Sequence, residues 1–182
     1  SDDMATFSGD ATGSVVEDAV LTNSAYGTLV VTDPDHDQSA FAAPQDGDLV
    51  KGSTYAIKTP YGLFFFNQES GEWSFELNNG STAVQSLGEG KTAEASFHVK
   101  SIDGSADQTV TVTITGVNDL ASFGGVQELQ VMADARDPVS GGVWVEDDDE
   151  GESAFQADTS LKGQYAQAIE HFRRTLKRRE SA

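Results

Sequence analysis

Residues 27–37 read GTLVVTDPDHD. The first half is an apolar and threonine run that predicts a short β-strand, and the second half places aspartates at every other position, Asp33, Asp35 and Asp37. Carboxylates this close together repel one another, and a hard cation such as Ca²⁺ relieves the repulsion through oxygen ligands. The stretch therefore predicts a strand that ends in a calcium-binding turn.

The same design returns later in the chain. Residues 142–150 read GVWVEDDDE, a strand-like run followed by acidic residues that include Asp147 and Asp149. Aspartate and proline also form ordinary polar turns, and a like-charge run is typical of a solvated surface. Repetition in an acidic, cysteine-free chain favours calcium at the first run. At the second run, calcium and a solvated face remain equal alternatives.

The repeat extends beyond the two acidic runs. ATFSG at residues 5–9 recurs as ASFGG at 121–125, 116 residues later. SAF at residues 39–41 recurs as SAF at 153–155, 114 residues later. A period of about 115 residues fits one β-sandwich per repeat.

This period predicts three parts. Residues 5–119 form one complete sandwich, and residues 120–165 form a partial second repeat without the tryptophan hairpin and the last two strands. Residues 166–182 contain five Lys or Arg against two acidic residues, and their apolar residues at helical spacing predict a basic helix. This tail is a non-native terminus or a helix that covers the unfinished repeat; binding to an acidic partner or a membrane is the less favoured alternative.

Alternating apolar and polar residues predict the strands. Residues 95–102 and 108–115 alternate on either side of a polar turn, and residues 61–66 and 72–77 flank a polar loop that ends in glycine, so each pair predicts a hairpin. Residues 81–87 predict one or two helical turns. Many short strands with regular turns predict an all-β, antiparallel sandwich of immunoglobulin-like or cadherin-like type.

Charge and composition limit the partners. The net charge is −19, and the basic tail contributes +3, so the first 165 residues carry −22. Such a surface repels phosphates and anionic headgroups, which excludes nucleic acid and makes a membrane an unlikely partner for the body of the protein. The chain has no cysteine and therefore no disulfides, so we expect calcium to stabilise the fold instead. No transmembrane run or export signal is visible, and we expect a piece of a larger, secreted protein.

Four motifs carry a family resemblance: GSVVED at residues 13–18, the strand and aspartates of 27–37, the aromatic hairpin of 61–77, and the strand with Asn-Asp of 109–119. In order and spacing they resemble the VCBS repeat family, the cadherin-like and immunoglobulin-like repeats of giant bacterial adhesins related to the repeats-in-toxin exoproteins. The resemblance covers nearly all of residues 6–119.

The resemblance implies a structural extender, exported by the type I route, that holds an adhesive tip away from the cell and is stiffened by calcium at its domain junctions. The partners would be neighbouring repeats of the same polypeptide, with a cell-surface or matrix ligand for the whole array. The resemblance implies these oxygen ligands: Glu17, Asp33, Asp35, Asp37, Asp103, Asn118 and Asp119. The acidic runs add Asp18, Asp147 and Asp149 as candidates. Leu120-Ala121 replaces the usual small residue and proline after Asn-Asp, which weakens the expectation of a stiff proline joint.

Catalysis is not expected. The chain has no nucleophile elbow, no phosphate loop, and no histidine spacing typical of a zinc or catalytic site. The competing function is a ligand-binding adhesion module, which would hold a carbohydrate on an exposed aromatic residue such as Trp73 or a peptide on an edge strand. Because Trp73 lies in an alternating hairpin, it is predicted to belong to the core.

Overall fold

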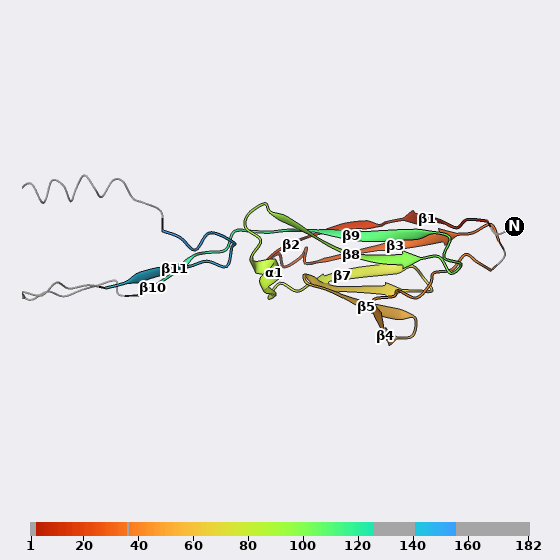
Figure 1. The fold of residues 1–182 in the computed structure, drawn as a ribbon, viewed down its shortest axis with the longest axis horizontal. Helices are drawn as coiled ribbons and strands as arrows, with labels where there is room; N and C mark the ends of the chain where they lie inside the picture. Colours follow the sequence, from red (N-terminus) through yellow and green to blue (C-terminus); the bar gives the residue numbers. More distant parts are fainter. Residues whose placement is uncertain (1–2, 36, 126–140, 156–182) are drawn as a thin grey trace, which may run out of the picture.

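Two facing β-sheets form the body of the protein (Figure 1). The computed structural model describes residues 3–35, 37–125 and 141–155. One sheet has the strand order β1-β3-β7-β6-β5-β4 and the other has the order β2-β9-β8. The elements are β1 (Thr6–Gly9), β2 (Thr12–Val16), β3 (Ser24–Thr32), β4 (Gly47–Lys51), β5 (Thr54–Thr59), β6 (Gly62–Asn67), β7 (Glu72–Leu77), α1 (Thr82–Gln85), β8 (Thr92–Lys100), β9 (Asp107–Thr115), β10 (Ser122–Gly125) and β11 (Val143–Glu146). This architecture confirms the all-β sandwich.

Both predicted hairpins are confirmed. Strands β8 and β9 pair antiparallel from Thr92↔Thr115 to Lys100↔Asp107, and β6 pairs antiparallel with β7. The predicted helical turns are the single turn α1, whose N-cap Ser81 accepts a hydrogen bond from the Val84 amide through its side chain. This turn connects β7 to β8 at the end of the sandwich opposite the N-terminus (Figure 1).

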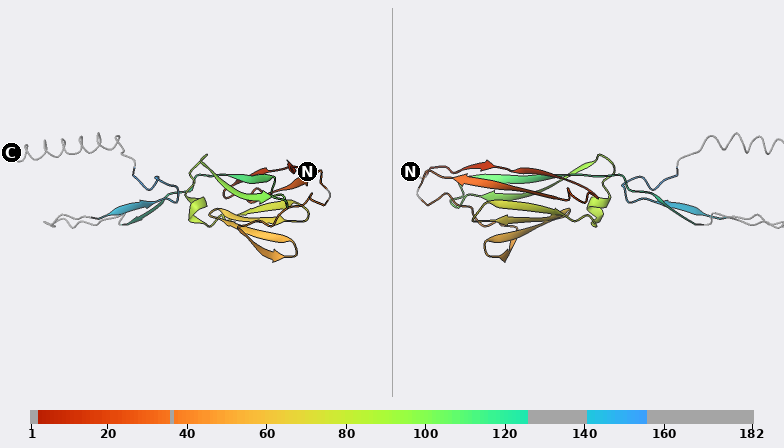
Figure 2. Two further views of the ribbon diagram at one scale, coloured as in Figure 1. Left: turned by 45° about the vertical axis from the view of Figure 1, so that its right-hand side comes forward. Right: turned by 180° about the vertical axis from the view of Figure 1, so that it is seen from behind.

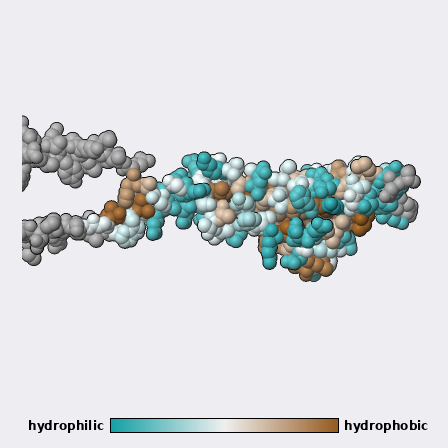
Figure 3. Space-filling model, in the orientation of Figure 1, coloured by the Kyte–Doolittle hydropathy of each residue, from teal (hydrophilic) through white to brown (hydrophobic). Residues whose placement is uncertain are grey.

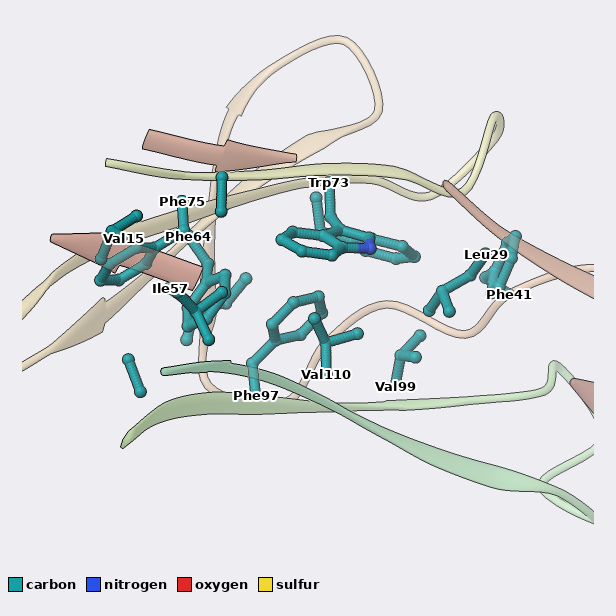
Figure 4. Packing of buried hydrophobic residues seen from close by; sticks show 14 of the residues in the cluster. Val15, Leu29, Phe41, Ile57, Phe64, Trp73, Phe75, Phe97, Val99 and Val110 are labelled. Carbon is teal, nitrogen blue, oxygen red and sulfur yellow. The ribbon is translucent and has the colours of Figure 1, made fainter. Parts of the chain in front are cut away.

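The aromatic hairpin supplies the centre of the core. Alternation along β6 and β7 buries Phe64, Phe66, Trp73 and Phe75, each 2 % exposed or less. Figure 4 shows Phe64, Trp73 and Phe75 between the sheets. The Phe64 ring lies 4.6 Å from the Phe75 ring and 4.9 Å from that of Phe97 on the opposite sheet. Offset and tilted aromatic pairs at these distances add to the stabilisation from apolar burial.

The chain changes sheets between β1 and β2. Gly9 adopts a positive φ of 94°, which a side chain would oppose, and the indole nitrogen of Trp73 donates a 2.7 Å hydrogen bond to the carbonyl oxygen of Asp10. The continuation, β2, then pairs with β9 in parallel. This parallel pair departs from the antiparallel pattern that the sequence predicts. The N-terminal segment therefore contributes to both sheets, through β1 in one and β2 in the other.

Strands β10 and β11 repeat the register of β1 and β3. Phe123↔Val145 corresponds to Phe7↔Val31, and Gly125 repeats the positive φ of Gly9, at 102°. Figure 2 shows this hairpin extending away from the sandwich. Phe123 and Trp144 on these strands, and Phe155 beyond the turn that follows β11, are more than half exposed, and Figure 3 shows apolar surface in this region. The remainder of the predicted second repeat and the whole basic tail lie outside the described residues.

The two tryptophans provide a matched test of the core. Trp73→Phe removes the donor to Asp10 and leaves a void, so we expect the free energy of unfolding to fall by about 2 to 4 kcal/mol. Trp144, which is 54 % exposed, is the control. The Trp144→Phe substitution should change the free energy of unfolding by less than about 0.5 kcal/mol. Urea unfolding measures both, and equal losses would contradict the assignment of Trp73 to the core.

Candidate metal centre

The two acidic runs form turns with the same hydrogen bonds at opposite ends of the sandwich. The N-terminal turn, described at residues 33–35 and 37–39, follows β3, and the junction turn, residues 147–153, follows β11. The amide of the first aspartate donates to a serine hydroxyl in each: Asp33 to Ser39 at 2.8 Å and Asp147 to Ser153 at 2.9 Å. Each serine hydroxyl in turn donates to the carbonyl of the same aspartate.

The second aspartate of each turn is bound to the first. The Asp35 amide donates to Asp33 Oδ1 at 2.7 Å, and the Asp149 amide donates to Asp147 Oδ1 at 2.9 Å. These bonds orient both carboxylates of each turn from the backbone. The aspartates of the repeated sequence therefore form one structural unit, present twice.

The match includes the residue that precedes the first strand of each repeat. The Asp3 amide donates to Asp35 Oδ2 at 2.6 Å, and the Asp119 amide donates to Asp149 Oδ2 at 2.9 Å. Asp37 takes a left-handed φ of 64°, and its counterpart Gly151, with a φ of 88°, carries no side chain. The shared carboxylates of the two turns are therefore the first two aspartates.

Each turn holds a buried carboxylate oxygen without a hydrogen-bond donor. Asp149 is 2 % exposed and its Oδ1 has no donor, while Asp33 is 8 % exposed and the same holds for its Oδ2. A carboxylate removed from water loses its hydration and gains nothing from an oxygen left unpaired. Such an oxygen fits a hard cation as its missing partner.

The first repeat contributes a second buried carboxylate. Glu17, directly after β2, is 1 % exposed. Its Oε1 accepts 2.8 Å from Gln85 Nε2 of α1, and its Oε2 accepts 3.1 Å from the Val117 amide of the linker. Because the three residues come from β2, α1 and the segment after β9, the end of the sandwich fixes this carboxylate rigidly.

The junction turn lies against this end of the sandwich. The Glu150 amide donates to the Ser86 carbonyl at 3.3 Å, and a Cβ on Gly88 would lie 3.5 Å from Glu152 Oε1. Carboxylate oxygens of Asp147, Asp149 and Glu152 lie within 4.8 Å of one another. We call Glu17, Asp119 and the junction turn together the joint.

Carboxylates of the joint affect one another electrostatically. Burial raises the pKa of Glu17 above its ordinary value, and the charge of Asp119 raises it further. Burial likewise raises the pKa of Asp119, whose largest charge contributions come from Asp18 and Asp149. Asp119 Oδ2 is also buried without a hydrogen-bond donor. The joint therefore concentrates negative charge.

The structure divides the predicted ligands between the two ends. At the joint lie Glu17, Asp18, Asn118, Asp119, Asp147 and Asp149. Asp33, Asp35, Asp37 and Asp103 lie at the opposite end, near the N-terminus (Figure 1). Hydrogen bonds from Ser101 and Ser105 hold the pKa of Asp103 below its ordinary value, which engages this carboxylate in its own turn. The Asn118 side chain donates to the Asp119 carbonyl.

Sequence reasoning missed Glu152 and Gln85. Glu152 could have been found from its position just before the serine that closes the turn, in a run otherwise matched to residues 33–39. No local pattern identifies Gln85, because its contact with Glu17 joins residues 68 positions apart.

The fold is a β-sandwich with a matched acidic turn at each end. Residues 2–116 match the family of bacterial cadherin-like domains, and the chain belongs to this family. Members are adhesion-type structural domains, generally extracellular or on the cell surface and typically without enzymatic activity. A comparison with curated proteins finds no match. Within the part of the chain that the structure describes, no helix has the length and apolarity needed to cross a membrane.

The raised pKa values predict how the calcium-free joint responds to pH. A carboxyl group whose pKa is higher in the folded than in the unfolded protein stabilises the fold when it is protonated. This stabilisation is complete below the unfolded pKa, which is 4.5 for Glu17, and is lost as the pH rises through the folded pKa. In chelator, the protection factors of the Val117 and Asp119 amides should therefore be higher near pH 4.5 than near pH 7.5. Amide exchange corrected for intrinsic rates measures this.

Two comparisons sharpen that experiment. Glu17→Gln has no proton to gain and should reduce the pH dependence at Val117, whereas Glu94→Gln, an exposed change on β8, should not. Protection that falls on acidification of the calcium-free protein would contradict the electrostatic description of the joint.

Proposed function

We propose that this chain is a calcium-stiffened extender module of a large secreted or cell-surface bacterial adhesin. The observation that carries the proposal is the buried Asp149 carboxylate. It belongs to the second repeat, it is bound to the linker amide of Asp119, and one of its oxygens has no donor. A cation at this point would be shared between the repeats.

The residues present fit calcium. Ca²⁺ takes about six to eight oxygen ligands at flexible geometry, and the joint offers carboxylates from both sides. The residues that would hold the ion are Glu17 and Asp119 from the first repeat and its linker, and Asp147, Asp149 and Glu152 from the junction turn. A bound ion would supply positive charge that replaces mutual repulsion by attraction to a common centre. Without that charge, repulsion favours separation of the turn from the sandwich.

The N-terminal turn supports a place in an array. It presents the same backbone-oriented carboxylates as the junction turn, at the end of the sandwich where a preceding repeat would dock. The partners proposed are therefore neighbouring repeats of the same polypeptide. The motif resemblance to VCBS repeats supports an adhesin of the repeats-in-toxin type, exported by the type I route.

The competing carbohydrate-binding function depended on an exposed aromatic residue. Trp73 is 2 % exposed and its indole nitrogen is bound to Asp10, so it offers no stacking surface. This observation removes Trp73 from the lectin-like alternative, which keeps the exposed Trp144 on β11, next to the junction turn, as its candidate.

Calcium should stabilise the protein. With a Kd on the order of 10⁻⁴ to 10⁻³ M, calcium near 1 mM contributes roughly 0.4 to 1.4 kcal/mol per site, a shift in Tm of several degrees. Asp149→Asn should remove most of the increment at the joint, and the exposed change Asp48→Asn on β4 should preserve it. Calorimetry in chelator and in ~10 mM calcium measures the effect; identical melting curves would overturn the calcium assignment. Magnesium should act more weakly because it releases its waters reluctantly.

Calcium should also restrict motion between the sandwich and the β10–β11 hairpin. We expect the full chain to show a larger maximum dimension by small-angle scattering in calcium than in chelator, because the shared ion prevents bending at the linker. Asn118→Ala combined with Asp119→Ala should abolish the difference while the sandwich stays folded by circular dichroism. Equal dimensions in both conditions for the unmodified chain would count against a stiffening role.

A further inference from the structure

The two acidic turns share further backbone hydrogen bonds, and these align a position at which their side chains differ in charge. The Gln38 amide donates to the Asp35 carbonyl at 3.4 Å, and the Glu152 amide donates to the Asp149 carbonyl at 3.3 Å. The next contact is also shared: the amides of Ala40 and Ala154 donate to the carbonyls of those same residues, 38 and 152. Position 38 in the first repeat therefore corresponds to position 152 in the second, with glutamine in one and glutamate in the other.

This difference changes which carboxylates gather within the turn. Glu152 lies in a cluster with Asp147 and Asp149, with carboxylate oxygens within 4.8 Å of one another. Gln38 offers a neutral amide at that place. The junction turn carries five acidic residues over its seven positions and the N-terminal turn carries three.

The surroundings of the two turns correspond in part. Asp119 at the junction turn matches Asp3 at the N-terminal turn, and the joint adds Glu17, which is 1 % exposed. Both turns nevertheless keep a buried carboxylate oxygen without a donor, on Asp149 and on Asp33. Both turns therefore suit a cation, and within the described residues only the junction turn brings three carboxylates within 4.8 Å of one another.

From this comparison we propose that the two turns bind calcium in a fixed order, the joint first and the N-terminal turn at higher calcium, and that the residue at positions 152 and 38 sets much of the gap. The inference rests on the proposed calcium function and deepens it, because affinity in oxygen-ligand calcium sites follows the number of charged ligands. The joint would then be stiff at calcium concentrations that leave the N-terminal turn empty. A graded response of this kind gives the two ends of one module different calcium thresholds.

A residue-resolved calcium titration of the full chain tests the order. Amide resonances of Asp149 and Glu152 report the joint, and those of Asp35 and Gln38 report the N-terminal turn. We expect the midpoint at the joint to lie at a calcium concentration lower by on the order of tenfold. Coincident midpoints, or a lower midpoint at the N-terminal turn, would overturn the inference while leaving the proposed calcium function intact. No response at either turn up to about 10 mM calcium would instead overturn the proposed function itself.

Exchanging the two side chains is the matched control. The double variant Gln38→Glu with Glu152→Gln keeps the net charge of the chain, so a change in overall electrostatics cannot explain its effect. The midpoint of the N-terminal turn should fall and that of the joint should rise, by several-fold each. Midpoints that stay in place in this folded variant would overturn the role assigned to positions 38 and 152.

Discussion

Repulsion between carboxylates that the fold holds close together is the constraint on which the arrangement of the two repeats depends. Glu17 is fixed by Gln85 and Val117, and Asp149 is fixed by Asp119, so these acidic groups cannot separate by rotating their side chains. The repulsion is relieved by protonation, by movement of the whole turn, or by a cation. At neutral pH a cation would keep both the charges and the contact, which is what the proposed calcium function requires of the joint.

The sandwich provides the rigid side of this joint. Aromatic packing between the sheets and the change of strand at Gly9, secured by the bond from Trp73 to Asp10, involve no acidic side chain. The core is therefore expected to keep its fold whether or not an ion is present. Since Glu17 directly follows β2, the parallel pairing of β2 with β9 places this carboxylate beside the linker that leaves β9. Core packing and the position of the site are linked through that one strand.

Much of the fold follows from local pattern, and less of the site does. The alternation of residues 108–115 and the polar loop between residues 67 and 71 predict β9 and the β6–β7 hairpin, because a period of two and a turn are local properties. The crossing from β1 to β2 was not predicted, since it depends on a tertiary bond to Trp73. The acidic turns were found through their repetition. The burial of Glu17 and its contact with Gln85 required the fold, because sequence distance conceals them.

The matched turns also explain why sequence identity between the repeats is concentrated in a few positions. The serine, the two aspartates and the residue with a left-handed φ each make a contact or a conformation that the turn needs, and Asp37 and Gly151 satisfy the last requirement in different ways. Exposed positions can vary, as Pro34 and Asp148 do. Position 152 differs from both groups, because its backbone contact is retained while its side chain adds to the carboxylate cluster. The turn can therefore keep its shape while its charge, and with it the strength of the joint, changes from repeat to repeat.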